Sequence, residues 1–79
     1  MKKLTQEIFK YAPDWVQSAA VDSDGEAYFY SVSKSDLEMS ESWYAYLHND
    51  DVSVDFIGEY DATDWQNSAI DRDNHENKD

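Results

Sequence analysis

The stretch SAAVDSDGEAYFYSV, residues 18–32, constrains the fold of this chain more than any other segment. Two apolar runs flank the pair Asp24-Gly25, which is favoured in tight turns whose central residues need a positive φ angle. The stretch therefore predicts a β-hairpin, with strands near residues 18–22 and 26–32.

The same turn carries alternating acids, Asp22, Asp24 and Glu26, which are also the ligand types of a calcium loop. An EF-hand loop requires glycine at its sixth position and glutamate at its twelfth. Counting from Asp22, those positions hold Ala27 and Ser33. The motif fails, so we interpret the acids as turn residues and expect no metal site.

Residues 4–11, LTQEIFKY, place Leu4, Ile8 and Tyr11 on one face of a helix. Pro13 ends this pattern, because proline has no backbone N–H and its ring clashes with the preceding helical turn. We therefore expect a helix at the start of the chain that lies across a sheet.

Residues 40–48, SESWYAYLH, fit two structures. Trp43 and Leu47 would share one face of a helix capped by Ser40, whereas Trp43, Ala45 and Leu47 also alternate as in a strand. We favour the helix and keep the strand as the alternative. The other elements that we expect are a helical turn from Ser33 or Ser35 through Leu37, a strand at residues 52–57 that Gly58 ends, and a helical turn with a capping box at residues 63–66.

The chain has 79 residues, which we interpret as one domain, residues 1–79. It has no cysteine, so no disulfide supports the fold. Three Trp, three Phe and six Tyr residues compensate, since each aromatic side chain buries roughly 150–250 Å². Residues 71–79 are polar and predict a frayed tail. The sum is a small α+β domain, with short helices packed on an antiparallel sheet of three or more strands.

The sequence contains no pattern typical of an enzyme or of a cofactor-binding protein. His48 and His75 are 27 residues apart, and His75 falls in the expected tail, so we expect no metal site. There is no Gly-x-Ser-x-Gly motif, and both glycines are assigned to turns, which leaves none for a phosphate-binding loop. We therefore expect neither catalytic activity nor a cofactor.

The segment LTQEIFKYAPDW lacks the apolar run of a signal peptide, and no stretch approaches the roughly 20 apolar residues of a membrane span. An acidic surface also repels anionic lipid. We expect a soluble cytoplasmic protein that does not bind membranes.

The net charge of −12, from 18 acids and six bases, is unevenly distributed along the chain. The 37 residues between Lys34 and Arg72 contain ten acids and no lysine or arginine, so these acids have no base nearby in sequence. Duplex DNA carries one charge per roughly 1.7 Å, so a charge of −12 corresponds to about 20 Å of duplex. Such a domain would repel nucleic acid, but it could occupy a basic groove that binds nucleic acid.

Three segments resemble small acidic phage-encoded proteins, namely LTQEIF, APDWVQSAAVDSDGEAYFY and DATDWQNSAIDR, which together cover about half of the chain. Phage proteins of this kind include anti-CRISPR proteins, some of which imitate DNA in the groove of a CRISPR effector. The resemblance implies an inhibitor that acts in the host cytoplasm. It carries no catalytic motif and assigns no role to the segment DWQNSAIDR.

The hypothesis that follows is a phage-encoded inhibitor that presents a DNA-like acidic surface to a host nucleic-acid-binding defence protein, with a CRISPR effector subunit as the favoured partner. The alternative is a phage accessory module that binds a protein through an aromatic patch, with acids that serve only solubility. The acids expected to replace phosphates are Glu38, Glu41, Asp50, Asp51, Asp55, Glu59, Asp61 and Asp64, and the tyrosines expected beside them are Tyr44, Tyr46 and Tyr60.

Overall fold

Strands and single turns of 3-10 helix make up the regular structure of this protein in a computed structural model, which describes residues 2–40, 43–45 and 52–73. In that part of the chain no helix exceeds the four residues of η1, so the fold is richer in β-structure than the α+β class predicted from the sequence. In chain order the elements are η1 (Gln6–Phe9), β1 (Ser18–Val21), β2 (Glu26–Tyr30), η2 (Lys34–Asp36), β3 (Leu37–Met39), β4 (Trp43–Ala45), β5 (Val54–Glu59), η3 (Trp65–Asn67) and β6 (Ile70–Asp71).

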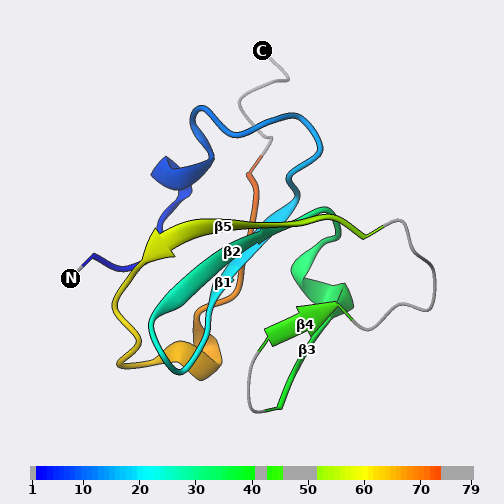
Figure 1. Cartoon of the computed structure of the whole chain (residues 1–79). Helices are drawn as coiled ribbons and strands as arrows, with labels where there is room; N and C mark the ends of the chain where they lie inside the picture. Colours follow the sequence, from blue (N-terminus) through cyan, green and yellow to red (C-terminus); the bar gives the residue numbers. More distant parts are fainter. Residues whose placement is uncertain (1, 41–42, 46–51, 74–79) are drawn as a thin grey trace.

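The predicted antiparallel sheet is confirmed, and it has four strands in the order β5-β2-β1-β6 (Figure 1). All four residues of β1 are buried, because this strand has a neighbour on each side and a packed layer on each face. β3 and β4 form a separate two-stranded antiparallel sheet. Among the described strands, β5 and β6 form the two edges of the main sheet.

The predicted hairpin is confirmed as β1 and β2, but its turn differs from the expected type. Gly25 has φ +91°, whereas no non-glycine residue in the described part of the chain has a positive φ. The Gly25 N–H donates to the Asp22 carbonyl (2.9 Å), and the Asp22 N–H donates to the Glu26 carbonyl (2.8 Å). This is a three-residue loop in which a turn through Ser23 and Asp24 is followed by a left-handed glycine. A mirror-image turn would have required a positive φ at Asp24 too.

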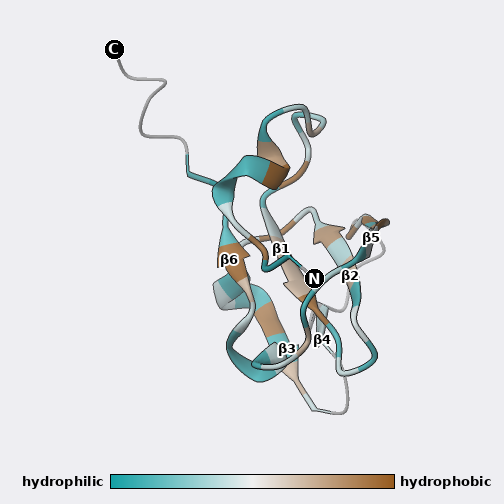
Figure 2. Ribbon diagram, turned by 90° about the vertical axis from the view of Figure 1, so that its left-hand side faces the viewer, coloured by the Kyte–Doolittle hydropathy of each residue, from teal (hydrophilic) through white to brown (hydrophobic). Residues whose placement is uncertain are grey.

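Apolar side chains cover both faces of the main sheet, because successive residues of a strand point to opposite faces. Ala19 belongs to a cluster on one face and Ala20 to a cluster on the other. The first cluster has Phe9, Val16, Ala19 and Phe29 as its buried members, and the second has Ala20, Tyr30, Leu37 and Ala69. In Figure 2 apolar residues, drawn brown, mark β6 and the end of η1.

The helix predicted at residues 4–11 is wrong, since only the single turn η1 forms. The Thr5 hydroxyl caps this turn by accepting from the Glu7 N–H (3.3 Å), and Phe9 stacks on Phe29 with ring centroids 5.8 Å apart. Tyr11, expected on the apolar face, is 89% exposed. An eight-residue segment before a proline is too short to propagate a helix, so packing of Phe9 decides the local structure.

The helix favoured at residues 40–48 is also wrong where the structure describes this segment, because β4 is a strand, as in the alternative. Its backbone is fixed by distant side chains. The Trp43 N–H donates to Asp22 Oδ1 (2.8 Å), and the Tyr30 hydroxyl donates to the Trp43 carbonyl (3.2 Å). The Trp43 indole donates to the Trp65 carbonyl (2.9 Å). These tertiary bonds outweigh local helix propensity.

The two expected helical turns form as three-residue 3-10 turns, η2 and η3, and neither has the expected side-chain cap. Leu37 lies in β3 rather than in the turn, and the Ser33 hydroxyl contacts the Ser35 hydroxyl (2.8 Å) instead of capping η2. The capping box at residues 63–66 does not form, because the Thr63 hydroxyl donates to the Asp61 carboxylate (2.6 Å).

The strand predicted at residues 52–57 is confirmed as β5, but Gly58 does not end it. Gly58 lies within the strand opposite Ala27, with φ +119°, and the register shifts between Ala27 and Tyr28. A β-bulge of this kind needs one residue in a conformation that glycine adopts without strain. Pairing therefore continues to the end of β5.

Residues 71–73, predicted to begin a frayed tail, belong to the fold, whereas residues 74–79 lie outside the described part. Asp71 is the second residue of β6, and the Arg72 N–H donates to the Gln17 carbonyl (2.8 Å). The Arg72 guanidinium donates to four carbonyls, one at the end of η1 and three in the segment that joins η1 to β1. These belong to Pro13 (2.7 Å), Val16 (3.1 Å), Ala12 (3.2 Å) and Phe9 (3.3 Å).

Candidate partner-binding surface

Six carboxylates from three segments gather at the turn end of the β1–β2 hairpin. Glu26 lies opposite Glu59 in the β2–β5 pair, and the Tyr60 N–H donates to the Gly25 carbonyl (2.8 Å). The chain beyond β5 therefore runs beside the hairpin turn, and η3 packs against β1 nearby (Figure 1). The six residues, which we call the hairpin-end acidic cluster, are Asp22, Asp24, Glu26, Glu59, Asp61 and Asp64.

Glu26 and Glu59 form the least compensated part of this cluster. They are directly opposite one another on neighbouring strands, where like charges destabilise a sheet. The Tyr28 hydroxyl donates to Glu26 Oε1 (2.9 Å), and this hydrogen bond raises the pKa of Tyr28. Glu59 is exposed, and no hydrogen bond joins its carboxylate to another described residue. The pair therefore presents two adjacent negative charges to solvent.

Three other members also hold the local backbone in place. Asp24 Oδ1 accepts from the Glu26 N–H (3.0 Å), which stabilises the turn. Asp64 Oδ1 accepts from the Asn67 side-chain amide (3.0 Å). Hydrogen bonds from the Thr63 hydroxyl and N–H lower the pKa of Asp61, so this carboxylate remains ionised to lower pH than an ordinary aspartate.

Asp22 differs from the rest because its half-buried carboxylate joins the two sheets. Its carboxylate accepts the Trp43 N–H described above and so ties β4 to the main sheet. Burial raises the pKa of Asp22, with smaller contributions from the charges of Asp24 and Glu26. Protonation of Asp22 therefore favours the folded state. Its contribution to stability is largest below the ordinary aspartate pKa of 3.8 and is lost as the pH rises through the raised pKa.

Few bases lie near the cluster. Within the described residues no lysine or arginine forms an ion pair with its six carboxylates. The charge of Lys3 makes a minor contribution to the lowered pKa of Asp61. Lys34 and Arg72 lie at the other end of the sheet, where the Lys34 N–H donates to Asp71 Oδ1 (2.6 Å). The start of the chain therefore compensates part of the charge at Asp61, where the Asp61 N–H donates to the Lys2 carbonyl (2.7 Å), whereas within the described residues Glu26 and Glu59 have no base bonded to them.

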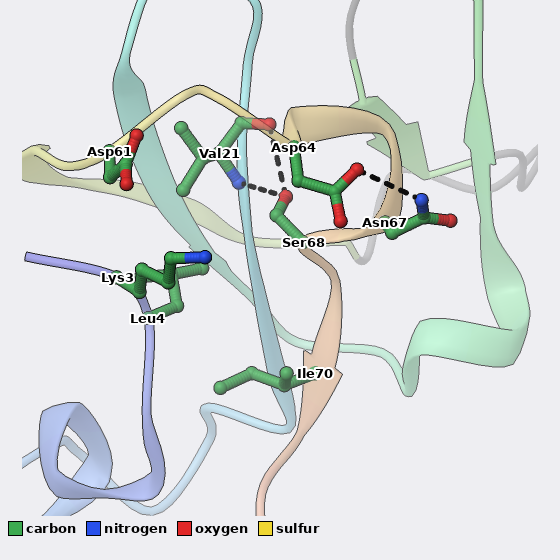
Figure 3. A pocket seen from close by; sticks show the side chains of 8 residues that line it. All are labelled: Lys3, Leu4, Val21, Asp61, Asp64, Asn67, Ser68 and Ile70. Carbon is green, nitrogen blue, oxygen red and sulfur yellow. Dashed lines mark hydrogen bonds between the residues drawn. The ribbon is translucent and has the colours of Figure 1, made fainter.

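A small hollow of about 150 Å³ lies beside the cluster, between the first residues of the chain and η3 (Figure 3). Val21, Leu4 and Ile70 supply its apolar lining, and Asp61 and Asp64 supply carboxylates. The remaining lining residues are Lys3, Asn67 and Ser68. This volume is below the roughly 300–1,000 Å³ of a small-molecule site. Among the described residues, the acidic cluster included, no group of three or more His, Asp and Glu side chains is placed to hold a metal ion.

The structure places only part of the predicted contact set in one region. Glu59, Asp61 and Asp64 lie in the hairpin-end acidic cluster. Asp55 is exposed on β5 opposite Phe29, away from the turn. Glu38 and Tyr44 are exposed and face each other across the separate β3–β4 sheet, and Tyr60 is half-buried beside Gly25. Glu41, Tyr46, Asp50 and Asp51 lie outside the described residues.

Sequence reasoning missed Asp22, Asp24 and Glu26 as members of the charged surface, because it treated them only as turn residues. The available signal was the hairpin itself. Had the strand at 52–57 been paired antiparallel with the second hairpin strand, its carboxyl end would have met the turn. Glu59 would then have been expected beside Glu26.

β5 also exposes apolar side chains. Val54 and Phe56 are 52% and 53% exposed, and they share a face of the sheet with Tyr28. The rings of Phe56 and Tyr28 meet edge to face at a centroid distance of 5.6 Å. Large apolar groups left this exposed in a small domain are candidates for contact with a partner.

Comparisons with protein-family models, with curated proteins and with solved structures found no match for this chain. No helix of the described residues is long and apolar enough to cross a membrane. The functional interpretation therefore depends on charge and geometry.

Proposed function

We propose that this protein binds a basic, nucleic-acid-binding protein and blocks its nucleic-acid groove, with the hairpin-end acidic cluster in the place of phosphates. The resemblance to phage proteins suggests a host defence protein in the host cytoplasm, with a CRISPR effector subunit as the first candidate. The protein acts by occupying the groove and carries out no catalysis.

The observation that carries this proposal is the pair Glu26 and Glu59. Two carboxylates directly opposite each other cost stability, and a lysine at either position would remove that cost. Surface residues that oppose folding are typical of sites kept for function. A basic groove would neutralise this pair on binding, as it neutralises phosphates.

The overall charge and size support the same function. The Cα radius of gyration is 12.1 Å, so the charge of −12 is carried by a body comparable in size to the roughly 20 Å of duplex DNA with equal charge. Opposite fields would speed association with a basic protein and make that association sensitive to salt.

A second candidate function follows from β5. The exposed side chains of Val54 and Phe56, with Tyr28 beside them, form an apolar patch that a protein partner could cover without any imitation of DNA. In that case the acids would serve only solubility.

Affinity capture from a nuclease-treated lysate of a defence-bearing host separates the two functions. Immobilised protein should retain a basic DNA-binding protein, identified by mass spectrometry, and added duplex DNA should release it. The double variant Glu26→Lys/Glu59→Lys should lose this capture. The matched control Asp14→Lys/Asp36→Lys makes the same charge change at two exposed acids away from the cluster and should keep it.

Equal loss of capture in both variants would mean that only the net charge matters and not the position of the acids. Retention in both would eliminate the phosphate-mimic function and favour the apolar patch. Asp71 is unsuitable as a control, because its carboxylate accepts the Lys34 N–H and its reversal would disturb the fold.

A further inference from the structure

The outer edge of β5 presents backbone groups as well as side chains. The Ser31 N–H donates to the Ser53 carbonyl (3.0 Å), which shows that the backbone of Ser53 faces β2. In an antiparallel pair alternate residues face the partner strand, so Asp55 also faces β2, whereas Val54 and Phe56 face outward. Within the described residues no group bonds to the outward N–H and C=O groups of these two residues.

The side chains around this edge alternate in chemistry. Val54 and Phe56 are half-exposed on one face of the sheet, and Asp55 is exposed on the other. A strand added to this edge would place two side chains beside the apolar pair and the side chain between them beside a carboxylate. The matching pattern is apolar–basic–apolar.

The opposite edge of the same sheet is closed by side chains. The Gln6 amide donates to the Asp71 carbonyl (2.6 Å), and its oxygen accepts from the Asp73 N–H (2.9 Å). Beyond the end of β6, the Ser68 hydroxyl bonds to the backbone of β1. It accepts from the Val21 N–H (2.9 Å) and donates to the Val21 carbonyl (3.2 Å). Side chains therefore replace a neighbouring strand at this edge.

We propose that β5 pairs through its open edge with an extended strand of the partner protein that alternates apolar and basic residues. Main-chain hydrogen bonds to Val54 and Phe56 supply affinity, and a lysine or arginine opposite Asp55 supplies selectivity. The basic character of this partner rests on the proposed function. The bulge at Gly58 limits the regular edge to a short segment.

Charge complementarity selects this occupant over a second copy of the chain. Two copies paired through β5 would bring Asp55 and Glu59 of each against the other, and each copy carries a net charge of −12. Like charges placed opposite each other destabilise strand pairing. A basic strand meets the same residues with attraction.

The probe for this site is a peptide of alternating lysine and valine, compared with a peptide of alternating lysine and proline that has the same charge but cannot form a ladder. In 0.15 M NaCl, the lysine–valine peptide should bind about tenfold more tightly by calorimetry. It should also slow amide exchange at Val54 and Phe56 in NMR spectra. Equal affinity of the two peptides, or protection elsewhere, would overturn the proposal.

A pair of variants isolates the backbone contribution. Val54→Ala and Val54→Pro both remove the isopropyl group, but only proline removes the outward N–H, and an edge position tolerates proline. Val54→Pro should bind the lysine–valine peptide about tenfold more weakly than Val54→Ala. Equal binding by two folded variants would overturn the proposal. If Val54→Pro does not fold, the amide protection in the unaltered protein decides.

Sedimentation of the free protein tests whether a second copy of the chain occupies the edge. A dimer that is lost in Val54→Pro but kept in Val54→Ala would mean that β5 pairs with a second copy.

Failure of the proposed function is distinguishable from failure of this inference. Protection of Val54 and Phe56 by the peptide without any capture of a DNA-binding protein would leave strand pairing in place. Capture of a DNA-binding protein without protection of these amides would contradict strand pairing and leave the proposed function in place.

Discussion

Both edges of the main sheet have backbone N–H and C=O groups that point away from the neighbouring strand. At one edge side chains bond to these groups, and at the other they have no partner among the described residues. On the β6 side, Gln6 bonds to the outward groups of Asp71 and Asp73, and beyond the end of β6 Ser68 bonds to the Val21 backbone groups of β1 that a longer strand would have taken. At β5, the outward groups of Val54 and Phe56 have no partner in the described residues. An open edge is a template for pairing with other chains, and natural proteins block such edges. Closing only one suggests that the other has a use.

The acids of β5 protect its open edge against pairing with a second copy of the chain. Asp55 and Glu59 on β5, within a chain of net charge −12, oppose pairing between copies, while they leave the edge free for a basic strand. In the proposed function the negative charge would therefore have two roles, since it would attract a basic partner and oppose self-association. The predictions below disturb the closed edge, the open edge or the charge between them.

Arg72→Ala should have the largest effect, because it removes the donor that joins four carbonyls of residues 9–16 to the residue that follows β6. Hydrogen bonds to charged groups contribute roughly 1.5–3 kcal/mol each and are not additive, so we expect a loss of about 3 kcal/mol. Urea denaturation followed by circular dichroism measures it. Lys34→Ala removes the same charge from an exposed side chain and should change little; equal stability of the two variants would contradict the role of Arg72.

Ser68→Ala should come next. The Val21 backbone is fully buried, and without the hydroxyl its N–H and C=O groups lose their partner at a cost of roughly 1–3 kcal/mol. Ser53→Ala, a serine beside the open edge whose hydroxyl bonds to no described residue, is the matched control and should be neutral. Similar melting temperatures for the two variants would mean that Ser68 does not close the edge.

Gln6→Ala should cost less, about 0.5–1.5 kcal/mol, because its bonds to Asp71 and Asp73 are exposed to water. The more specific result is faster amide exchange at Asp73, which would make the outer part of β6 resemble β5. Gln66→Ala, an exposed glutamine on η3, controls for the loss of an amide side chain. An unchanged exchange rate at Asp73 would refute the role of Gln6.

Glu59→Lys should produce the smallest change in stability, and in the opposite direction. It converts the like-charged pair with Glu26 into an opposite-charged pair, which is worth roughly 0.2–1 kcal/mol. The melting temperature should rise while capture of the partner weakens. Asp36→Lys carries the same charge change without a facing acid, so an equal rise there would show that only net charge matters.

Local patterns were sufficient to predict the hairpin and β5. Apolar alternation and the pair Asp24-Gly25 identify paired strands, and residues 52–57 alternate in the same way. The helix at residues 4–11 failed for a physical reason, since a short helix depends on tertiary packing and Pro13 follows closely. In this segment the structure contains the single turn η1, which the packing of Phe9 holds in place.

Local patterns allowed β4 only as an alternative to a helix and did not predict β6, because distant groups hold both strands. Trp43 is fixed by bonds to Asp22, Tyr30 and Trp65, and β6 has only two residues. The candidate surface shows the same limit. The charge pattern identified Glu59, Asp61 and Asp64 but missed the three acids of the hairpin, because their gathering depends on a strand register that includes the bulge at Gly58.

Amide hydrogen exchange of the free protein tests the contrast between the two edges most directly. Val21, Val54 and Phe56 all point their N–H groups away from a neighbouring main-chain strand. If one edge is closed by side chains and the other is open, Val21 should exchange slowly in the unaltered protein and rapidly in Ser68→Ala, while Val54 and Phe56 exchange rapidly in both. Slow exchange at Val54 and Phe56 in the unaltered protein would mean that the β5 edge is already covered and would contradict the account.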